Sequence, residues 1–117
     1  MRRGKEIAQG SHASMDFLVA VLRSQLQAQA EGPLTIELSA AEKSWVLHGM
    51  AKICLRVNSE EELLHHHQKA LAAGLKSHLI QDSGRTEFHG QPTYTACAIG
   101  PDNAEHIDLI TSDLVLY

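Results

Sequence analysis

The sequence predicts a single α/β domain, residues 1–117, in which a mixed β-sheet carries helices on both faces. Segments with helical spacing of apolar residues alternate with short runs rich in β-branched residues. Between residues 52 and 81 a strand, a helix and a second strand follow one another, which is the order of a crossover unit. A length of 117 residues is enough for one hydrophobic core.

The first predicted element is a long helix over residues 5–27. Its apolar residues recur at intervals of three and four, which places them on one side of the helix. We expect this side, centred on Met15 and Leu22, to be buried. The turn-forming segment 31–33, Glu-Gly-Pro, ends the helical pattern. The apolar positions are Ala8, Met15, Leu18, Val19, Leu22 and Leu26.

A short second helix is predicted to begin at a capping box. Ser39 supplies the hydroxyl at the N-cap and Glu42 the carboxylate three residues later. Gly49 can close the helix. Trp45 and Val46 are the expected core residues of this helix.

The sequence pattern of residues 52–81 predicts the strand–helix–strand unit. Residues 52–57 contain apolar and β-branched residues over the length of a strand. Ser59 and Glu62 form a second capping box, and the helix that it starts should end at Gly74. Residues 77–81 are the next strand, and 82–86 have the composition of a tight turn.

The C-terminal part predicts a loop over residues 87–92, a third strand over 93–99 and a last helix near 102–111. The strand is rich in threonine and tyrosine, and Gly100-Pro101 is a good entry to a helix. The predicted order is therefore α, α, β, α, β, β, α, with three strands.

Composition and charge limit the function classes. With 44% hydrophobic and 21% charged residues, the chain has the composition of a soluble globular domain. No apolar run approaches the ~20 residues of a membrane span, and the start lacks a signal-peptide core, so we expect a cytoplasmic protein without a membrane partner. The net charge of −4 argues against broad non-specific nucleic-acid binding, so any RNA contact should be local. Cys54 and Cys97 lie in apolar runs and are expected to be buried free thiols.

Lys5, Gln9 and His12 form a polar stripe on the first helix, within an arc of about 60° beside its apolar side. One interpretation is a solvated helix border. The other is the wall of a pocket, because a lysine in the first turn opposes the helix dipole and would be relieved by a phosphate or an oxyanion. Arg2 and Arg3 add positive charge at the same end.

Asp82 and Thr86 flank a second polar cluster, at the end of a predicted central strand. Open α/β sheets usually place their ligands at such ends, so Asp82, Arg85 and Thr86 are candidate site residues. A simple turn, in which Asp82 bonds to nearby amides, explains the same residues equally well.

The consecutive histidines 65–67 do not predict a metal site. On a helix they point 100° apart, so they cannot converge on one ion. A solvated face in which Glu61 and Glu62 pair weakly with His65 and His66 explains them better. The chain also lacks a Gly-x-Ser-x-Gly elbow, a nucleotide-binding glycine loop and a Cys-x-x-Cys motif. We therefore expect no cofactor and no metal, and water as the attacking group.

Three stretches together resemble the type-2 peptidyl-tRNA hydrolases. They are residues 3–13, Arg-Gly-Lys-Glu-Ile-Ala-Gln-Gly-Ser-His-Ala; residues 79–86, Leu-Ile-Gln-Asp-Ser-Gly-Arg-Thr; and residues 98–101, Ala-Ile-Gly-Pro. Their order and spacing, with the closing segment 113–117, cover nearly the whole chain. The resemblance implies cofactor-free hydrolysis of the ester between a peptide and tRNA, on an α/β domain with a four-stranded mixed sheet.

The resemblance also implies roles for particular residues. Lys5, Gln9, Ser11 and His12 match the first motif, and Asp82 and Thr86 match the second. The family's lysine, aspartate and threonine are usually assigned to catalysis. The candidate catalytic residues are Lys5, His12, Asp82 and Thr86, and the candidate substrate-binding residues are Gln9, Ser11, Arg2, Arg3 and Arg85.

Two alternatives stay open beside this prediction. A non-catalytic relative could use the same fold to bind tRNA or protein, and the same pocket could hydrolyse another acyl ester, such as that of D-aminoacyl-tRNA. The family normally begins with a β-strand just upstream of the segment that matches residues 1–5, and we expect this strand to be missing here. A homodimer is a further expectation.

Overall fold

A computed structural model describes residues 1–82 and 91–117 of the chain. None of the helices in these two ranges is long and apolar enough to cross a membrane. The elements are α1 Arg3–Gln27, α2 Ala40–Leu47, β1 Leu55–Arg56, α3 Glu60–Ala72, β2 Ser77–Asp82, β3 Thr93–Ile99, α4 Ala104–Thr111 and β4 Val115–Leu116.

The α/β class is confirmed, but the strands are arranged differently from the prediction. The four strands in the described part of the chain form two antiparallel pairs, β2 with β3 and β1 with β4, where one mixed sheet of three strands was expected. The predicted crossover therefore links strands of two different pairs. In the longer pair, Ser77 lies opposite Ile99 and Asp82 opposite Thr93, with a register shift after Ile80.

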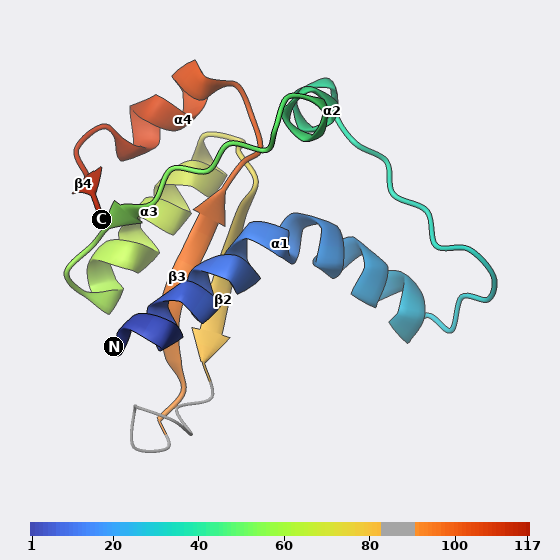
Figure 1. Cartoon of the computed structure of the whole chain (residues 1–117), viewed down its shortest axis with the longest axis horizontal. Helices are drawn as coiled ribbons and strands as arrows, with labels where there is room; N and C mark the ends of the chain where they lie inside the picture. Colours follow the sequence, from blue (N-terminus) through green and yellow to red (C-terminus); the bar gives the residue numbers. More distant parts are fainter. Residues whose placement is uncertain (83–90) are drawn as a thin grey trace.

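Helices pack on both faces of the β2–β3 sheet, as predicted. α1 and α3 each contact both strands (Figure 1). On β2 the side chains of His78 and Asp82 bond to α1, whereas Ser77, one residue from His78, bonds to α3. Because successive side chains of a strand point to opposite faces, the two helices lie on opposite sides of the sheet.

The predicted buried side of α1 was wrong. Met15, at its expected centre, is 57% exposed, and the buried residues are Ala13 and Phe17. These lie on the side of the helix that also carries Lys5 and Gln9, because all four positions are related by steps of four. Lys5 and Gln9 of the polar stripe therefore face the sheet, where Asp82 and Thr95 bond to them, whereas His12 is exposed.

The capping box of α2 is confirmed, since Ser39 Oγ accepts from the Glu42 amide and the Glu42 carboxylate accepts from the Ser39 amide. The predicted core residues were half right. Trp45 packs edge-to-face on Phe17 of α1, with ring centroids 5.7 Å apart, but Val46 is 44% exposed. The buried residue of this helix is the capping residue Glu42 itself.

Glu42 is also tied to the start of β2, because its carboxylate lies 2.6 Å from Lys76 Nζ. Burial pushes the pKa of Glu42 upward, but hydrogen bonds from Lys76 and Ser39 outweigh this and hold the pKa below its usual range. The capping box thus joins α2 to the sheet by a charged contact.

α3 begins as predicted at Ser59, whose hydroxyl accepts from the Glu62 amide. The Glu62 carboxylate accepts from the amide of Asn58 instead of that of Ser59, so the second box is shifted by one residue. The helix ends before Gly74, whose φ of 81° favours glycine. Behind it lies the apolar core, formed by Ala70, Leu75 and Ile110 with Ile99 packed against them.

The cysteine prediction was wrong in part. Both thiols are free, but Cys54 is exposed, and only Cys97 on β3 is largely covered. Burial raises the pKa of the Cys97 thiol. Cys54 is exposed because β1 covers only Leu55–Arg56, so most of the predicted strand 52–57 lies outside the sheet.

Candidate active site

The centre of the candidate site is an ion pair between α1 and the end of β2. Lys5 Nζ lies 2.5 Å from Asp82 Oδ1, and their side chains are 15% and 9% exposed. Lys5 is placed there by the first turns of α1, and Asp82 by the last residue of β2. The two residues are 77 positions apart in sequence. The structure therefore brings the two halves of the predicted site together.

A second polar contact continues the site along α1, one helical turn from Lys5. Thr95 Oγ1 donates to Gln9 Oε1 at 2.6 Å. Thr95 also lines a cavity of about 280 Å³ between β3 and the start of α3. The Gln9 side chain is thereby held against β3.

A third contact lies further along the same helix–sheet interface. Asp16 Oδ2 is 3.0 Å from His78 Nδ1 on β2. Asp16 follows Gln9 by seven positions, which is two helical turns, so it lies on the same side of α1. A line of polar contacts thus joins α1 to the sheet, and Ala13 and Phe17 fill the space between them.

The other predicted residues of the first motif lie at the border of this interface. Arg2 and Arg3 are exposed at the start of α1, which gives the helix N-terminus a positive surface next to Lys5. Ser11 and His12 are exposed on α1, and His12 lies two helical turns beyond Lys5. The helix therefore covers Lys5 and Gln9 in part and leaves Ser11 and His12 accessible.

Two predicted site residues, Arg85 and Thr86, lie outside the described residues, as does most of the predicted turn 82–86. Asp82 is the last described residue before them, so they follow the ion pair directly in the chain.

Sequence reasoning missed Thr95, Asp16 and His78 as partners of the polar stripe. A signal was present, because Lys5, Gln9 and Asp16 share one side of the helix. Asp82 and His78 likewise share one face of β2, at a separation of four residues.

The histidines of α3 do not form the solvated face that was expected. His66 and His67 are buried, and only His65 is exposed. His66 bonds to Asp113, and His67 bonds to Ser77 at 2.7 Å. Burial first, and the nearby His78 second, lower the pKa of His67. The described residues contain no cluster of three or more His, Cys, Asp or Glu side chains suited to a metal ion.

This geometry can support hydrolysis of an activated ester. A carboxylate can take a proton from water, and an ammonium can stabilise a developing oxyanion. Both groups stand at the end of a strand, beside an exposed surface with positive charge. Such an arrangement suits a substrate that carries phosphates.

Comparison with known proteins decides the family. The profile of the peptidyl-tRNA hydrolase PTH2 family matches residues 1–117. The chain belongs to this family.

Similar proteins agree with the assignment. The chain is 36% identical over 116 residues to the peptidyl-tRNA hydrolase of Methanocaldococcus jannaschii, which covers 99% of this chain and 89% of that protein. It is 37% identical to the peptidyl-tRNA hydrolase of Sulfolobus acidocaldarius, over the same shares of both chains. It is 38% identical to that of Methanococcus maripaludis strain C6, over 99% of this chain and 88% of that protein. The resemblance seen in three short motifs thus extends along the chain.

Proposed function

We propose that this member of the PTH2 family cleaves the ester bond of peptidyl-tRNA by activating a water molecule, with Lys5 and Asp82 as its catalytic pair. The observation that carries the assignment of residues is their 2.5 Å contact in a largely buried position. A buried lysine–aspartate pair contributes little net stability, since desolvation offsets most of its attraction. A chemical role explains its presence better than a structural one.

The reaction needs one proton acceptor and one site of positive charge. Asp82 accepts a proton from the water, whose oxygen adds to the ester carbonyl carbon. Lys5 stabilises the negative charge that develops on the carbonyl oxygen. The bond to the ribose oxygen then breaks, and the proton held by Asp82 passes to that oxygen. The products are a tRNA with a free terminal hydroxyl and a peptide carboxylic acid, which releases its remaining proton to solvent and becomes a carboxylate.

Two variations of this mechanism remain part of the proposal. Asp82 can act through Thr86 or His12 instead of touching the water itself, and Lys5 can hold the terminal phosphate of tRNA instead of the oxyanion. The exposed position of His12 is compatible with contact to a bound substrate. Gln9, held by Thr95, would orient the substrate.

The tRNA would bind by local positive charge, because the net charge of the chain is −4. Arg2, Arg3 and Arg85 would contact its phosphates, and Ser11 would lie at the edge of the same surface. Arg2 and Arg3 are exposed at the helix end that carries Lys5, which supports this assignment.

The decisive experiment measures tRNA release from an N-acetylated aminoacyl-tRNA in single-turnover conditions. Replacing Asp82→Asn should lower the rate about 10²- to 10⁴-fold, because a general base is lost. Asp16→Asn is the matched control. It changes a carboxylate on the same interface, whose partner is His78, and should leave the rate within about threefold while it lowers stability.

Two outcomes would contradict the proposal. A wild-type rate in a folded Asp82→Asn variant would remove Asp82 from the mechanism. No hydrolysis by the folded wild-type chain, together with retained tRNA binding, would favour the non-catalytic binding protein.

We also propose that the protein is a cytoplasmic homodimer. The location follows from the substrate, which forms during translation. The dimer is supported by exposed large side chains on α4, on β4 and after it, namely Leu109, Val115, Leu116 and Tyr117, which a second copy could cover. Light scattering would measure the mass in solution, and Leu116→Glu should convert a dimer to a monomer.

A further inference from the structure

The charges of the chain are divided unequally between its N-terminal helix and the rest. Residues 1–27 contain four Lys and Arg and two Asp and Glu, a net charge of +2, whereas residues 28–117 contain six and twelve, a net charge of −6. The carboxylates of the first range, Glu6 and Asp16, are both partly covered, and Asp16 bonds to His78 on β2. The solvent side of α1 is therefore positive on a chain that is negative as a whole.

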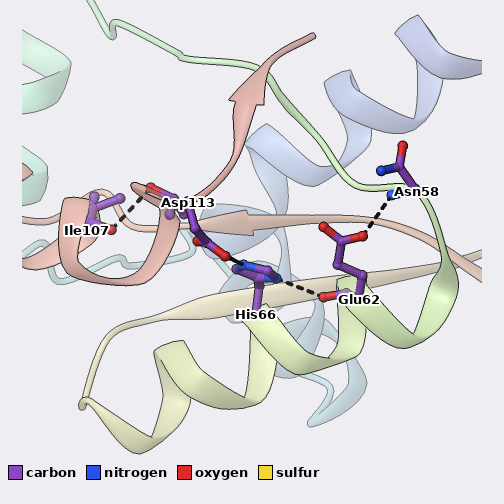
Figure 2. Close-up of polar contacts among 6 residues, drawn as sticks. Asn58, Glu62, His66, Ile107 and Asp113 are labelled. Carbon is purple, nitrogen blue, oxygen red and sulfur yellow. Dashed lines mark hydrogen bonds and ion pairs between the residues drawn. The ribbon is translucent and has the colours of Figure 1, made fainter.

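The opposite face of the β2–β3 sheet is negative. α3 begins with glutamates at positions 60–62, and it contains a single lysine and no arginine. Figure 2 shows the carboxylates of Glu62 and Asp113 beside this helix, where they bond to the amide of Asn58 and to His66. Because α1 and α3 lie on opposite faces of the sheet, the domain has a positive and a negative side.

Three basic side chains form one line along α1, at Lys5, His12 and Arg23. A helix makes one turn in about 3.6 residues, so Arg23 lies five turns beyond Lys5 on the same side, and His12 lies two turns beyond it. The line is about 27 Å long, because the helix rises 1.5 Å per residue. Lys5 bonds to Asp82, whereas His12 and Arg23 are exposed. We call this line the cationic side of α1.

Arg23 has no structural contact that explains its charge. Within residues 1–82 and 91–117 its guanidinium takes part in no ion pair. It also lies outside the last turn of α1, where a cation would stabilise the helix. Its N–H donors, whose planar arrangement matches a phosphate, face solvent. The side chain is therefore placed to contact an anionic partner.

We propose that the cationic side of α1 is the docking surface for the body of tRNA, and that Arg23 contacts a phosphate far from the ester. This inference deepens the proposed function, on which it rests for the identity of the nucleic acid. A polyanion is attracted to the positive side of the domain and repelled by the negative side, so the charge division also orients it. Arg23 lies about 27 Å from Lys5 along the helix, a distance that only a substrate with several phosphates spans.

Arg23→Gln is the main test variant, because the residue is exposed and glutamine has a helix propensity close to that of arginine. Arg23→Lys is the second variant and keeps the charge. The matched control is Lys69→Gln, which removes one positive charge from an exposed position of α3, on the negative side. The two glutamine variants have the same net charge, so a difference between them reports the position of the lost charge. The full chain is used throughout.

The first measurement is the dissociation constant of deacylated tRNA as a function of salt concentration. This ligand has no ester, so its binding is measured independently of hydrolysis. At roughly 0.1 M salt, Arg23→Gln should bind about three- to tenfold more weakly than the wild type. The slope of log K against log salt should become shallower by about 0.7 to 0.9, the value for one lost phosphate contact. Arg23→Lys and Lys69→Gln should each keep the wild-type slope.

Two results of this binding experiment would overturn the docking surface. One is an equal dissociation constant and slope in the wild type and Arg23→Gln. The other is an equal loss in Arg23→Gln and Lys69→Gln, because net charge, and not its place on α1, would then determine binding.

The second measurement is the enzyme concentration that half-saturates the single-turnover rate on N-acetylated aminoacyl-tRNA. In Arg23→Gln it should rise by the same factor as the dissociation constant of deacylated tRNA. The wild-type concentration in an active Arg23→Gln variant would overturn the inference while the proposed function stands. Failure of the proposed function looks different, because no folded variant would then hydrolyse the substrate, while binding of deacylated tRNA would still depend on Arg23.

Discussion

The two helices that cover the β2–β3 sheet contact it by different means. α1 does so through polar pairs, Lys5–Asp82, Gln9–Thr95 and Asp16–His78. α3 packs Ala70 into the apolar core with Leu75 and Ile110, and it also buries His66 and His67, of which His67 bonds to Ser77 on β2. Apolar burial stabilises a fold by roughly 25 cal/mol per Å², whereas buried ion pairs contribute little net stability. The apolar core beside α3 should therefore stabilise the domain more than the ion pair of α1 does, which agrees with the proposed catalytic role of Lys5 and Asp82.

The largest expected effect is a loss of hydrolysis rate at Lys5 that the structurally similar Lys76 should not show. Lys5→Met should lower the hydrolysis rate about 10²-fold, the usual loss when one group that stabilises an oxyanion is removed. Lys76→Met is the matched control, because Lys76 also pairs with a buried carboxylate, that of Glu42, but outside the site. It should lower the melting temperature and leave the single-turnover rate unchanged. Equal hydrolysis rates for Lys5→Met and Lys76→Met would contradict the catalytic role proposed for Lys5.

The next effect tests the α3 side. Ala70→Leu should lower the free energy of unfolding by about 1 to 3 kcal/mol, because its site is fully enclosed and an added isobutyl group overpacks it. Ala72→Leu places the same group at an exposed position of α3 and should change stability little. Denaturant titration measures both. The rate per folded molecule should be unaltered, and a rate loss in Ala70→Leu would show that α3 also shapes the site.

A smaller effect is expected at the second polar contact of α1. Thr95→Val removes the hydroxyl that donates to Gln9 and should weaken substrate binding by about three- to tenfold, the cost of one lost hydrogen bond. Thr111→Val, which removes a hydroxyl bonded within α4, is the control. KM for N-acetylated aminoacyl-tRNA is the readout, and an unchanged KM would remove Gln9 from substrate positioning.

The smallest effect is a pH dependence of stability at α2. The pKa of Glu42 is lowered in the folded state, so its contribution is fully present above the usual value of 4.5 and is lost as pH falls through the lowered value. Glu42→Gln should therefore show a shallower fall in melting temperature on acidification than the wild type. Parallel curves would mean that Lys76 and Ser39 do not stabilise the charged form.

Local signals in the sequence predicted much of the fold. The Ser39–Glu42 capping box marks the start of α2, and the glycine at 74 follows the end of α3. The segment of residues 93–99, which has high β-propensity, coincides with β3. These features depend on neighbouring residues, so a single sequence contains them.

The errors concern contacts between distant segments. The apolar periodicity of α1 pointed to Met15, but Asp82, Thr95 and His78 on the sheet receive the polar side of the helix instead. No local pattern identifies such partners. β4 is two residues long, and its pairing with Leu55–Arg56 cannot be seen in either segment alone.

Contacts between distant segments also limited the prediction of the candidate site. The Lys5 and Asp82 motifs were found through the family resemblance, because a helix border explained the first better than a site did, and a turn explained the second equally well. Their contact joins residues 77 positions apart, so it depends on the tertiary structure. The burial of His66 was missed for the same reason, since its partner Asp113 lies 47 positions away.

A double-mutant cycle on Lys5 and Asp82 tests the central claim most directly. Single-turnover rates are measured for the wild type, Lys5→Met, Asp82→Asn and the double variant, with thermal unfolding of each as the check on folding. If the pair acts as one catalytic unit, the double variant should be about as slow as the slower single variant. Rates near wild type in the folded single variants, or losses that simply multiply, would contradict the account.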